Sequence, residues 1–162
     1  MPSLRLLVSA IAIAVLVVGM HFDADPTAAA KTEAGKVVAF AKNQVTKPYK
    51  WGATGLRRYD CSGLVYRTFK ETGLLNKIGG TRKTSRGYYR WFRDRGLITR
   101  NPKKGDLVVW GKTRVTHIGI FIGYNSNGKP LAISSLYKGV SKHKVHAMNI
   151  PLKAYLRVKI SR

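Results

Sequence analysis

The fold is decided by the stretch Tyr59-Asp60-Cys61-Ser62-Gly63-Leu64-Val65-Tyr66-Arg67-Thr68-Phe69. This stretch places the only cysteine of the 162-residue chain at a predicted helix start. Asp60 belongs to the residue types that cap helix N-termini, since its carboxylate can accept from the free amides of the first turn. The apolar residues that follow recur at helical spacing, and Gly73 is a typical stop signal. The stretch therefore predicts a helix with Cys61 at its first position.

The position of Cys61 predicts a reactive thiol. Unpaired N–H groups and the positive end of the helix dipole favour thiolate, which should lower the pKa of Cys61, while the charge of Asp60 acts in the opposite direction. A second partner for the thiol is therefore expected. The same amides are suited to an oxyanion hole, and Gly63 should leave room for a substrate backbone.

The N-terminal segment gives this cysteine its context, because a lone cysteine is more often buried and inert. Arg5 followed by the apolar run 6–20 is typical of a signal peptide, and the alanines at 28–30 offer a cleavage site. We expect residues 1–30 to be a signal peptide and 31–162 to be one catalytic domain, with an uncleaved anchor as the alternative. An unpaired cysteine in an exported protein indicates intermolecular pairing or a reactive thiol.

The net charge of the chain indicates which kinds of partner it would attract. Thirty Lys and Arg against seven Asp and Glu give a formal charge of +23. Such a surface favours polyanions, which include nucleic acid, anionic lipid and the acidic polymers of a bacterial wall. No recognised nucleic-acid motif is present, and neither the single cysteine nor the histidines have the spacing of metal ligands. We therefore expect no metal and no specific nucleic-acid partner.

The remainder of the chain predicts a small sheet. Ile118, Ile120 and Ile122 alternate with His117 and its neighbours, so His117 should face away from the isoleucine layer. A hairpin turn over 124–130 separates this strand from the next. The expected elements are a helix at 34–45 and strands at 107–110, 116–122, 131–136 and 155–160.

Three ordered motifs resemble the NlpC/P60 family of cell-wall peptidases. They are the Cys61 stretch with the preceding 49–55 (YKWGATG), 105–108 (GDLV), and 116–123 (THIGIFIG). The resemblance covers roughly residues 34–160. It implies an α+β papain-like fold in which N-terminal helices, including the cysteine-bearing helix, pack on a small antiparallel sheet. It also implies a cysteine peptidase without a cofactor that cleaves peptidoglycan stems, typically between D-γ-glutamate and a diamino acid.

The resemblance assigns the base and the residues that contact substrate. Cys61 would be the nucleophile and His117 the general base; His143 and His146 compete for that role but lie in a basic stretch without comparable motifs. Four residues are expected to bind substrate: Tyr49, Trp51, Asp60 and Ser62. For the aromatic pair the alternative is packing beneath the catalytic helix.

The third catalytic position departs from the family, which usually places a polar residue there, commonly histidine, to orient the base. One register puts Ser134 at this position, and the other puts Ala132 there and leaves it empty. We favour Ser134 because Lys138-Gly139-Val140 follows at the usual distance. Serine orients an imidazole without charge, so activity would be modest unless a backbone carbonyl or water assists.

Together these features predict a secreted or periplasmic, wall-associated monomer that acts on peptidoglycan, binds anionic wall polymers, and does not stay inserted in a membrane after signal cleavage. Three rival functions remain. They are a catalytically idle cell-wall-binding protein of the same fold, a cationic protein that acts through charge alone, and an acyltransferase or amidase with the same dyad.

Overall fold

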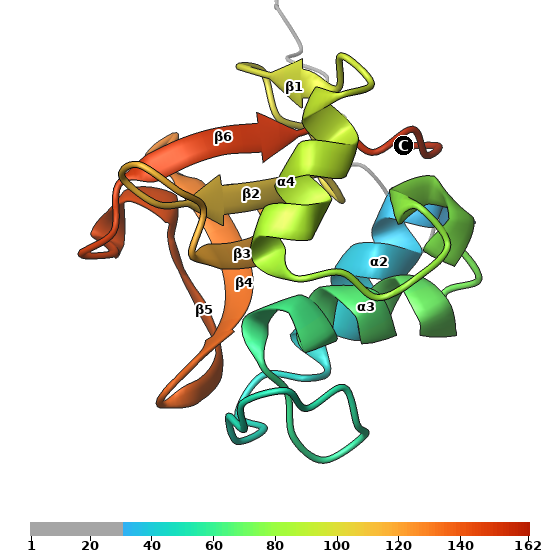
Figure 1. The fold of residues 1–162 in the computed structure, drawn as a ribbon, viewed down its shortest axis with the longest axis vertical. Helices are drawn as coiled ribbons and strands as arrows, with labels where there is room; N and C mark the ends of the chain where they lie inside the picture. Colours follow the sequence, from blue (N-terminus) through green and yellow to red (C-terminus); the bar gives the residue numbers. More distant parts are fainter. Residues whose placement is uncertain (1–30) are drawn as a thin grey trace, which may run out of the picture.

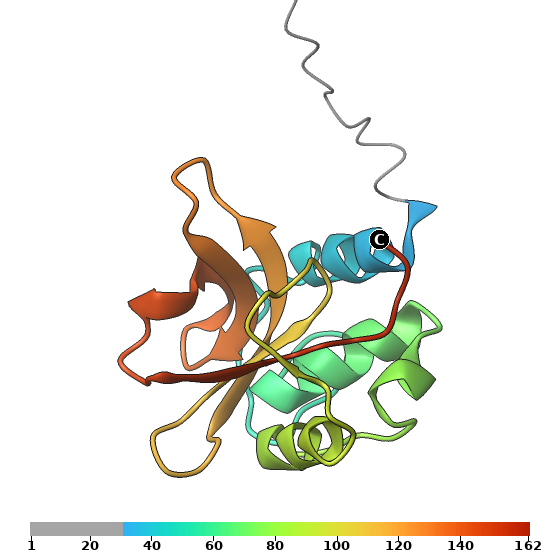
Figure 2. The ribbon, with the colours of Figure 1, turned by 90° about the horizontal axis from the view of Figure 1, so that it is seen from above.

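The structure is a computed structural model that describes residues 31–162. Three α-helices, α2 (Glu33–Lys42), α3 (Cys61–Glu71) and α4 (Ser85–Arg93), lie on one face of an antiparallel sheet (Figures 1 and 2). The six strands of this described part run in the order β1-β6-β2-β3-β4-β5. Their bounds are β1 Ile98–Thr99, β2 Leu107–Trp110, β3 His117–Tyr124, β4 Pro130–Leu136, β5 Gly139–Lys144 and β6 Leu152–Leu156. The α+β papain-like prediction is confirmed.

Two apolar layers cover the two faces of the sheet. The helices pack on the face that carries Ile118, Ile120 and Ile133, and together they form the main core. The opposite face carries a smaller cluster around Trp110 and Phe121, covered by the chain between β5 and β6. The alternation predicted for residues 116–122 is therefore confirmed. His117 faces the side of the smaller cluster, where its ring contacts Trp110.

The helix that carries the cysteine begins as predicted. Asp60 is the N-cap of α3, and its Oδ1 accepts from the amide of Gly63 at 2.6 Å. Buried apolar residues of α3, including Leu64 and Phe69, anchor the helix to the core. The cap and the buried face together fix the first turn, and with it Cys61, against the sheet.

The last predicted strand is only partly correct. Strand β6 ends at Leu156, whereas 155–160 had been expected. Asp106, which is fully buried, accepts from the amide of Val158 at 2.9 Å and from the side chains of Arg157 and Arg162. This carboxylate draws the final segment out of the ladder, so Asp106 anchors the end of the described chain.

The two ends of the described chain meet. The amide of Ala34 donates to the carbonyl of Ser161 at 3.0 Å, and Glu33 and Ser161 exchange two further hydrogen bonds. The predicted signal peptide, 1–30, lies outside the described residues. Within residues 31–162, no helix combines the length and apolar character needed to cross a membrane.

Candidate active site

Cys61 occupies the first position of α3 and is a partly buried free thiol. The predicted lowering of its pKa is wrong. Burial raises the pKa of the Cys61 thiol, and the negative charge of Asp60 raises it further. Hydrogen bonds from the backbone of Ile118, Ser62 and Cys61 itself lower it, but they do not compensate for desolvation. The resting site therefore favours the neutral thiol.

His117 begins β3 beside this thiol, and only 4% of its surface is exposed. Burial, with the nearby charge of His143, lowers the pKa of His117 to about 4. Its Nε2 is a buried atom without a hydrogen-bond partner among residues 31–162. At neutral pH the imidazole is therefore neutral, and it does not form an ion pair with the thiol.

The predicted third residue, Ser134, contacts a different histidine. Ser134 is fully buried, and its Oγ lies 2.8 Å from Nε2 of His143 on β5. The other nitrogen of that ring, Nδ1, lies 3.1 Å from the carbonyl oxygen of Lys144. Ala132, the alternative third residue, is buried in the smaller apolar cluster and offers no polar atom. The hydrogen bond in the structure is thus Ser134 to His143, not Ser134 to His117.

The indole ring of Trp110 lies against the rings of both histidines. The centroid of the Trp110 ring lies 5.3 Å from that of His117 and 5.8 Å from that of His143. Gly119 makes this arrangement possible, because a Cβ there would lie 2.9 Å from Cβ of Ser134 and 3.3 Å from the Trp110 ring. Both histidines, the indole and the serine therefore share one face of the sheet.

The thiol opens onto two neighbouring cavities. One has a volume of about 350 Å³ and extends toward α4, and the other, about 190 Å³, extends toward His117 and β4. Four residues line both of them: Tyr49, Trp51, Cys61 and Thr116. We refer to the pair as the cleft. Trp51 is 86% exposed, which excludes packing beneath the catalytic helix, and Tyr49 lies with its ring centroid 5.5 Å from that of Tyr137.

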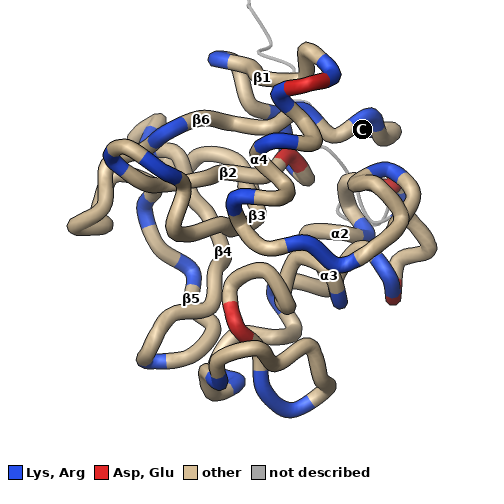
Figure 3. Tube along the Cα trace, in the orientation of Figure 1, with Lys and Arg blue, Asp and Glu red and all other residues tan. Residues whose placement is uncertain are grey.

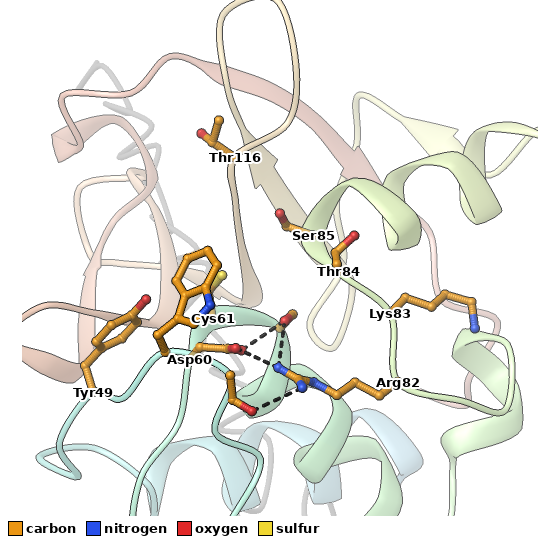
Figure 4. A pocket seen from close by; sticks show the side chains of 11 residues that line it. Tyr49, Asp60, Cys61, Arg82, Lys83, Thr84, Ser85 and Thr116 are labelled. Carbon is orange, nitrogen blue, oxygen red and sulfur yellow. Dashed lines mark hydrogen bonds and ion pairs between the residues drawn. The ribbon is translucent and has the colours of Figure 1, made fainter.

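Arg82 crosses the floor of the larger cavity and reaches Asp60 (Figure 4). Its guanidinium contacts the Asp60 carboxylate at 2.6 Å and the carbonyl of Gly52 at 3.2 Å. Ser62 donates to the other Asp60 oxygen at 2.9 Å. Asp60 and Ser62, which were predicted to bind substrate, thus line the cleft, but their polar atoms hydrogen-bond to each other. The sequence did not indicate Arg82, which lies 22 residues away in a glycine-broken basic stretch.

Gly63 serves a different purpose from the one expected. A Cβ at this position would lie 2.0 Å from the carbonyl oxygen of Ala53, which already receives the amide of Asp60 at 3.0 Å. The space beside the thiol is therefore filled by the chain's own loop. Gly63 lets that loop pack closely on α3, and no room for a substrate backbone is left there.

Lys and Arg positions are spread over the whole described trace (Figure 3). A groove of about 160 Å³ lies between α4 and the β2–β3 loop, and its basic lining residues are Arg86, Arg90, Arg93, Arg114 and Lys153. We call it the arginine groove. Arg93 pairs with Asp94, whereas Arg86, Arg90 and Arg114 form no ion pair within residues 31–162.

Comparisons with known proteins agree with this geometry. The model of the NlpC/P60 family matches residues 46–157. MepH of Escherichia coli K12, a murein DD-endopeptidase, is 33% identical over 142 residues, which is 79% of this chain and 51% of MepH. The chain therefore spans about half the length of that relative.

Two solved structures share the fold. An NlpC/P60 family protein from Bacillus cereus has a TM-score of 0.63 at 21% identity, covering 77% of this chain and 40% of that one. RipD of Mycobacterium tuberculosis, described as a non-catalytic domain adapted to peptidoglycan binding, has a TM-score of 0.57 at 17% identity, covering 78% and 97%.

Proposed function

The chain belongs to the NlpC/P60 family, and from this premise we propose that it is a cysteine peptidase that hydrolyses the peptide stems of bacterial peptidoglycan. Residues 31–162 would be the catalytic domain and residues 1–30 an export signal. One observation carries the proposal: the only cysteine lies at the first position of α3, at the junction of the two cavities, with His117 lining the same cleft.

The pKa directions define the chemistry of the dyad. The pKa of Cys61 is raised and that of His117 is lowered, so a preformed thiolate–imidazolium pair is unfavourable. His117 then acts as a general base during the attack, and because its Nε2 is enclosed, Nδ1 is the nitrogen that accepts the thiol proton. The sulfur bonds to the amide carbonyl carbon, and His117 returns the proton to the leaving amine. Water afterwards releases the acyl group and regenerates the thiol.

Backbone groups beside the sulfur would stabilise the oxyanion. The backbone of Ser62 and of Cys61 itself already hydrogen-bonds toward the sulfur. These groups are fixed by the Asp60 cap, so they need no rearrangement when charge develops on the carbonyl oxygen. Arg82, paired with Asp60, limits the field of that carboxylate at the thiol.

Two bonds in the stem are chemically reasonable substrates. The resemblance implied the D-γ-glutamyl–diamino acid bond, whereas the relative MepH is named a DD-endopeptidase, which acts on a bond between D-residues. The two-sided cleft, with Tyr49 and Trp51 exposed to both cavities, is suited to an extended peptide in either case. Mass analysis of the products separates the two.

The arginine groove supports retention on an acidic wall. Three guanidiniums without a carboxylate partner face a hollow that neighbours the cleft, and phosphate or carboxylate groups are their natural ligands. Added salt shortens the Debye length and so screens the charges. Binding to purified wall should therefore weaken strongly when the salt concentration rises from 50 to 500 mM. A double change, Arg86→Gln with Arg90→Gln, should reduce the affinity and the salt dependence. Binding that ignores salt would contradict this part of the proposal.

The second candidate function is a wall-binding protein without catalysis. One observation favours it: Nε2 of His117 has no partner, so no group in the structure holds the base in its active tautomer. RipD shows that the fold occurs in a protein described as non-catalytic. The intact Cys61 and the open cleft favour the peptidase.

Digestion of purified peptidoglycan decides between these functions. Residues 31–162 and the variant Cys61→Ala are incubated with peptidoglycan, and the released stem peptides are identified by mass. Fragments from the wild type alone would support the peptidase and identify its bond. No fragments from either protein, with both still bound to wall, would support the binding protein. Fragments from both would exclude Cys61 as the nucleophile.

A further inference from the structure

We infer that His143 is a positioning residue of the active site and acts on His117 through the hydroxyl of Ser134. This role extends the proposed peptidase function. The position that a polar residue was expected to fill holds a serine, and the serine is bonded to a histidine from the next strand, β5. The orienting function would thus be divided between two residues on adjacent strands.

The donor and the acceptor of the Ser134–His143 hydrogen bond follow from the contact between His143 and the carbonyl of Lys144. A carbonyl oxygen can only accept, so the 3.1 Å contact between His143 and Lys144 places a hydrogen on Nδ1 of His143. Burial lowers the pKa of His143, which keeps this ring neutral near pH 7. A neutral ring protonated at Nδ1 has a lone pair at Nε2. Nε2 therefore accepts the hydrogen of Ser134 Oγ across the 2.8 Å contact.

The Ser134 oxygen is then left as an acceptor. Its only hydrogen points to His143, and its lone pairs remain for a donor on the same face of the sheet. Ser134 lies across from Gly119, two residues from His117, and a diagonal neighbour at this spacing is within reach of a long side chain. Gly119 has no side chain to separate them. Nε2 of His117 is the buried atom on this face that lacks a partner.

A hydrogen bond from Nε2 of His117 to Oγ of Ser134 would select the tautomer that catalysis needs. A hydrogen on Nε2 of His117, donated to Ser134, leaves the lone pair on Nδ1 to accept the thiol proton. Catalytic hydrogen bonds are often open in the free enzyme and tighten when substrate binds. No carboxylate can replace the relay, because each acidic residue of 31–162 is bonded elsewhere. These residues are Glu33, Asp60, Glu71, Asp94 and Asp106.

Steady-state kinetics on a soluble stem peptide test the relay. We expect Ser134→Ala and His143→Leu each to lower kcat about tenfold with KM unchanged, the effect of losing one neutral hydrogen bond in a buried network. The double variant should be no slower than either single variant, because the two residues act as one unit. His143→Gln should recover most of kcat, since its amide oxygen can accept from Ser134. His146→Leu, an exposed neighbour, is the control and should leave kcat unchanged.

A second readout does not depend on activity. Long-range ¹H–¹⁵N spectra of histidine-labelled protein, recorded in the Cys61→Ala background with a stem peptide bound, report the tautomer of His117. It is expected as Nε2–H when Ser134 and His143 are intact and as a mixture in His143→Leu and Ser134→Ala. Wild-type kcat in His143→Leu, or an unchanged His117 tautomer, would overturn the relay while leaving the peptidase intact. A wild type without activity would remove the peptidase, and the tautomer would then decide the relay by itself. If His143→Leu fails to fold, Ser134→Ala gives the decision: wild-type kcat or an unchanged His117 tautomer in that variant would overturn the relay.

Discussion

Acidification from pH 7 to pH 4 should weaken the fold through His117. The unfolded chain holds this histidine at a pKa near 6.5, whereas burial lowers its pKa to about 4 in the folded protein. Between these values the unfolded chain binds a proton that the folded chain does not, so the contribution of His117 is complete above pH 6.5 and is lost as the pH falls toward 4. Comparing the protonation of His117 in the unfolded and the folded chain at pH 4 gives a loss of about 3 kcal/mol in the free energy of unfolding.

Urea denaturation at several pH values measures this loss. The free energy of unfolding is compared between the wild type and His117→Gln, which keeps a polar side chain but does not titrate. All other titrating groups are common to both proteins, so the difference between the two pH dependences reports His117 together with its coupling to His143. His146→Gln, at an exposed position, should follow the wild type. A difference below about 1 kcal/mol between pH 7 and pH 4 would refute the view that burial keeps the base neutral.

Three further substitutions test the frame of the site. Gly63→Ala should lower the free energy of unfolding by about 2 kcal/mol or more, because the new Cβ would lie 2.0 Å from a loop carbonyl; a melting curve like that of the wild type would contradict this close approach. Asp106→Ala should destabilise by about 3 kcal/mol or more in the same assay, since two arginines lose a fully buried carboxylate. Arg82→Gln should raise the pKa of Cys61 by leaving Asp60 unpaired, so alkylation of the thiol by iodoacetamide at pH 8 should slow; equal or faster alkylation would count against the Arg82 pair.

The helix α3, with Cys61 at its first position, could be predicted because its signals are local. Asp60, Cys61 and the apolar spacing of α3 all lie within eleven residues, and the capping geometry follows from residue type. Alternation within one strand predicted the face on which His117 lies, and the family resemblance proposed it as the general base. The prediction failed for the pKa of Cys61, because the helix terminus is visible in the sequence whereas the depth of burial is a property of the assembled fold.

For a related reason, the sequence indicated His143 only as a rival for the general base and not as a partner of Ser134. Strand β5 lies at the edge of the sheet and carries Lys142 and Lys144, so its sequence resembles a basic loop rather than a strand. Its contact with Ser134 depends on the register of two strands, which no single stretch reveals. The approach of Arg82 to Asp60 is likewise a contact between distant segments. Local chemistry and the family resemblance thus proposed Cys61 and His117 as the reacting pair, and pairing between strands and loops determines their surroundings.

The hydrogen bonds between Glu33, Ala34 and Ser161 bring both ends of the described chain to one place, beside α2 (Figure 2). A short glycine-rich linker could therefore join the two ends without distorting the sheet. New termini could then open at the exposed hairpin turn between β3 and β4, around Asn127. A circular permutant of this design should fold with the same cleft, and it would allow an affinity handle or a second domain to be attached at a new point on the molecule.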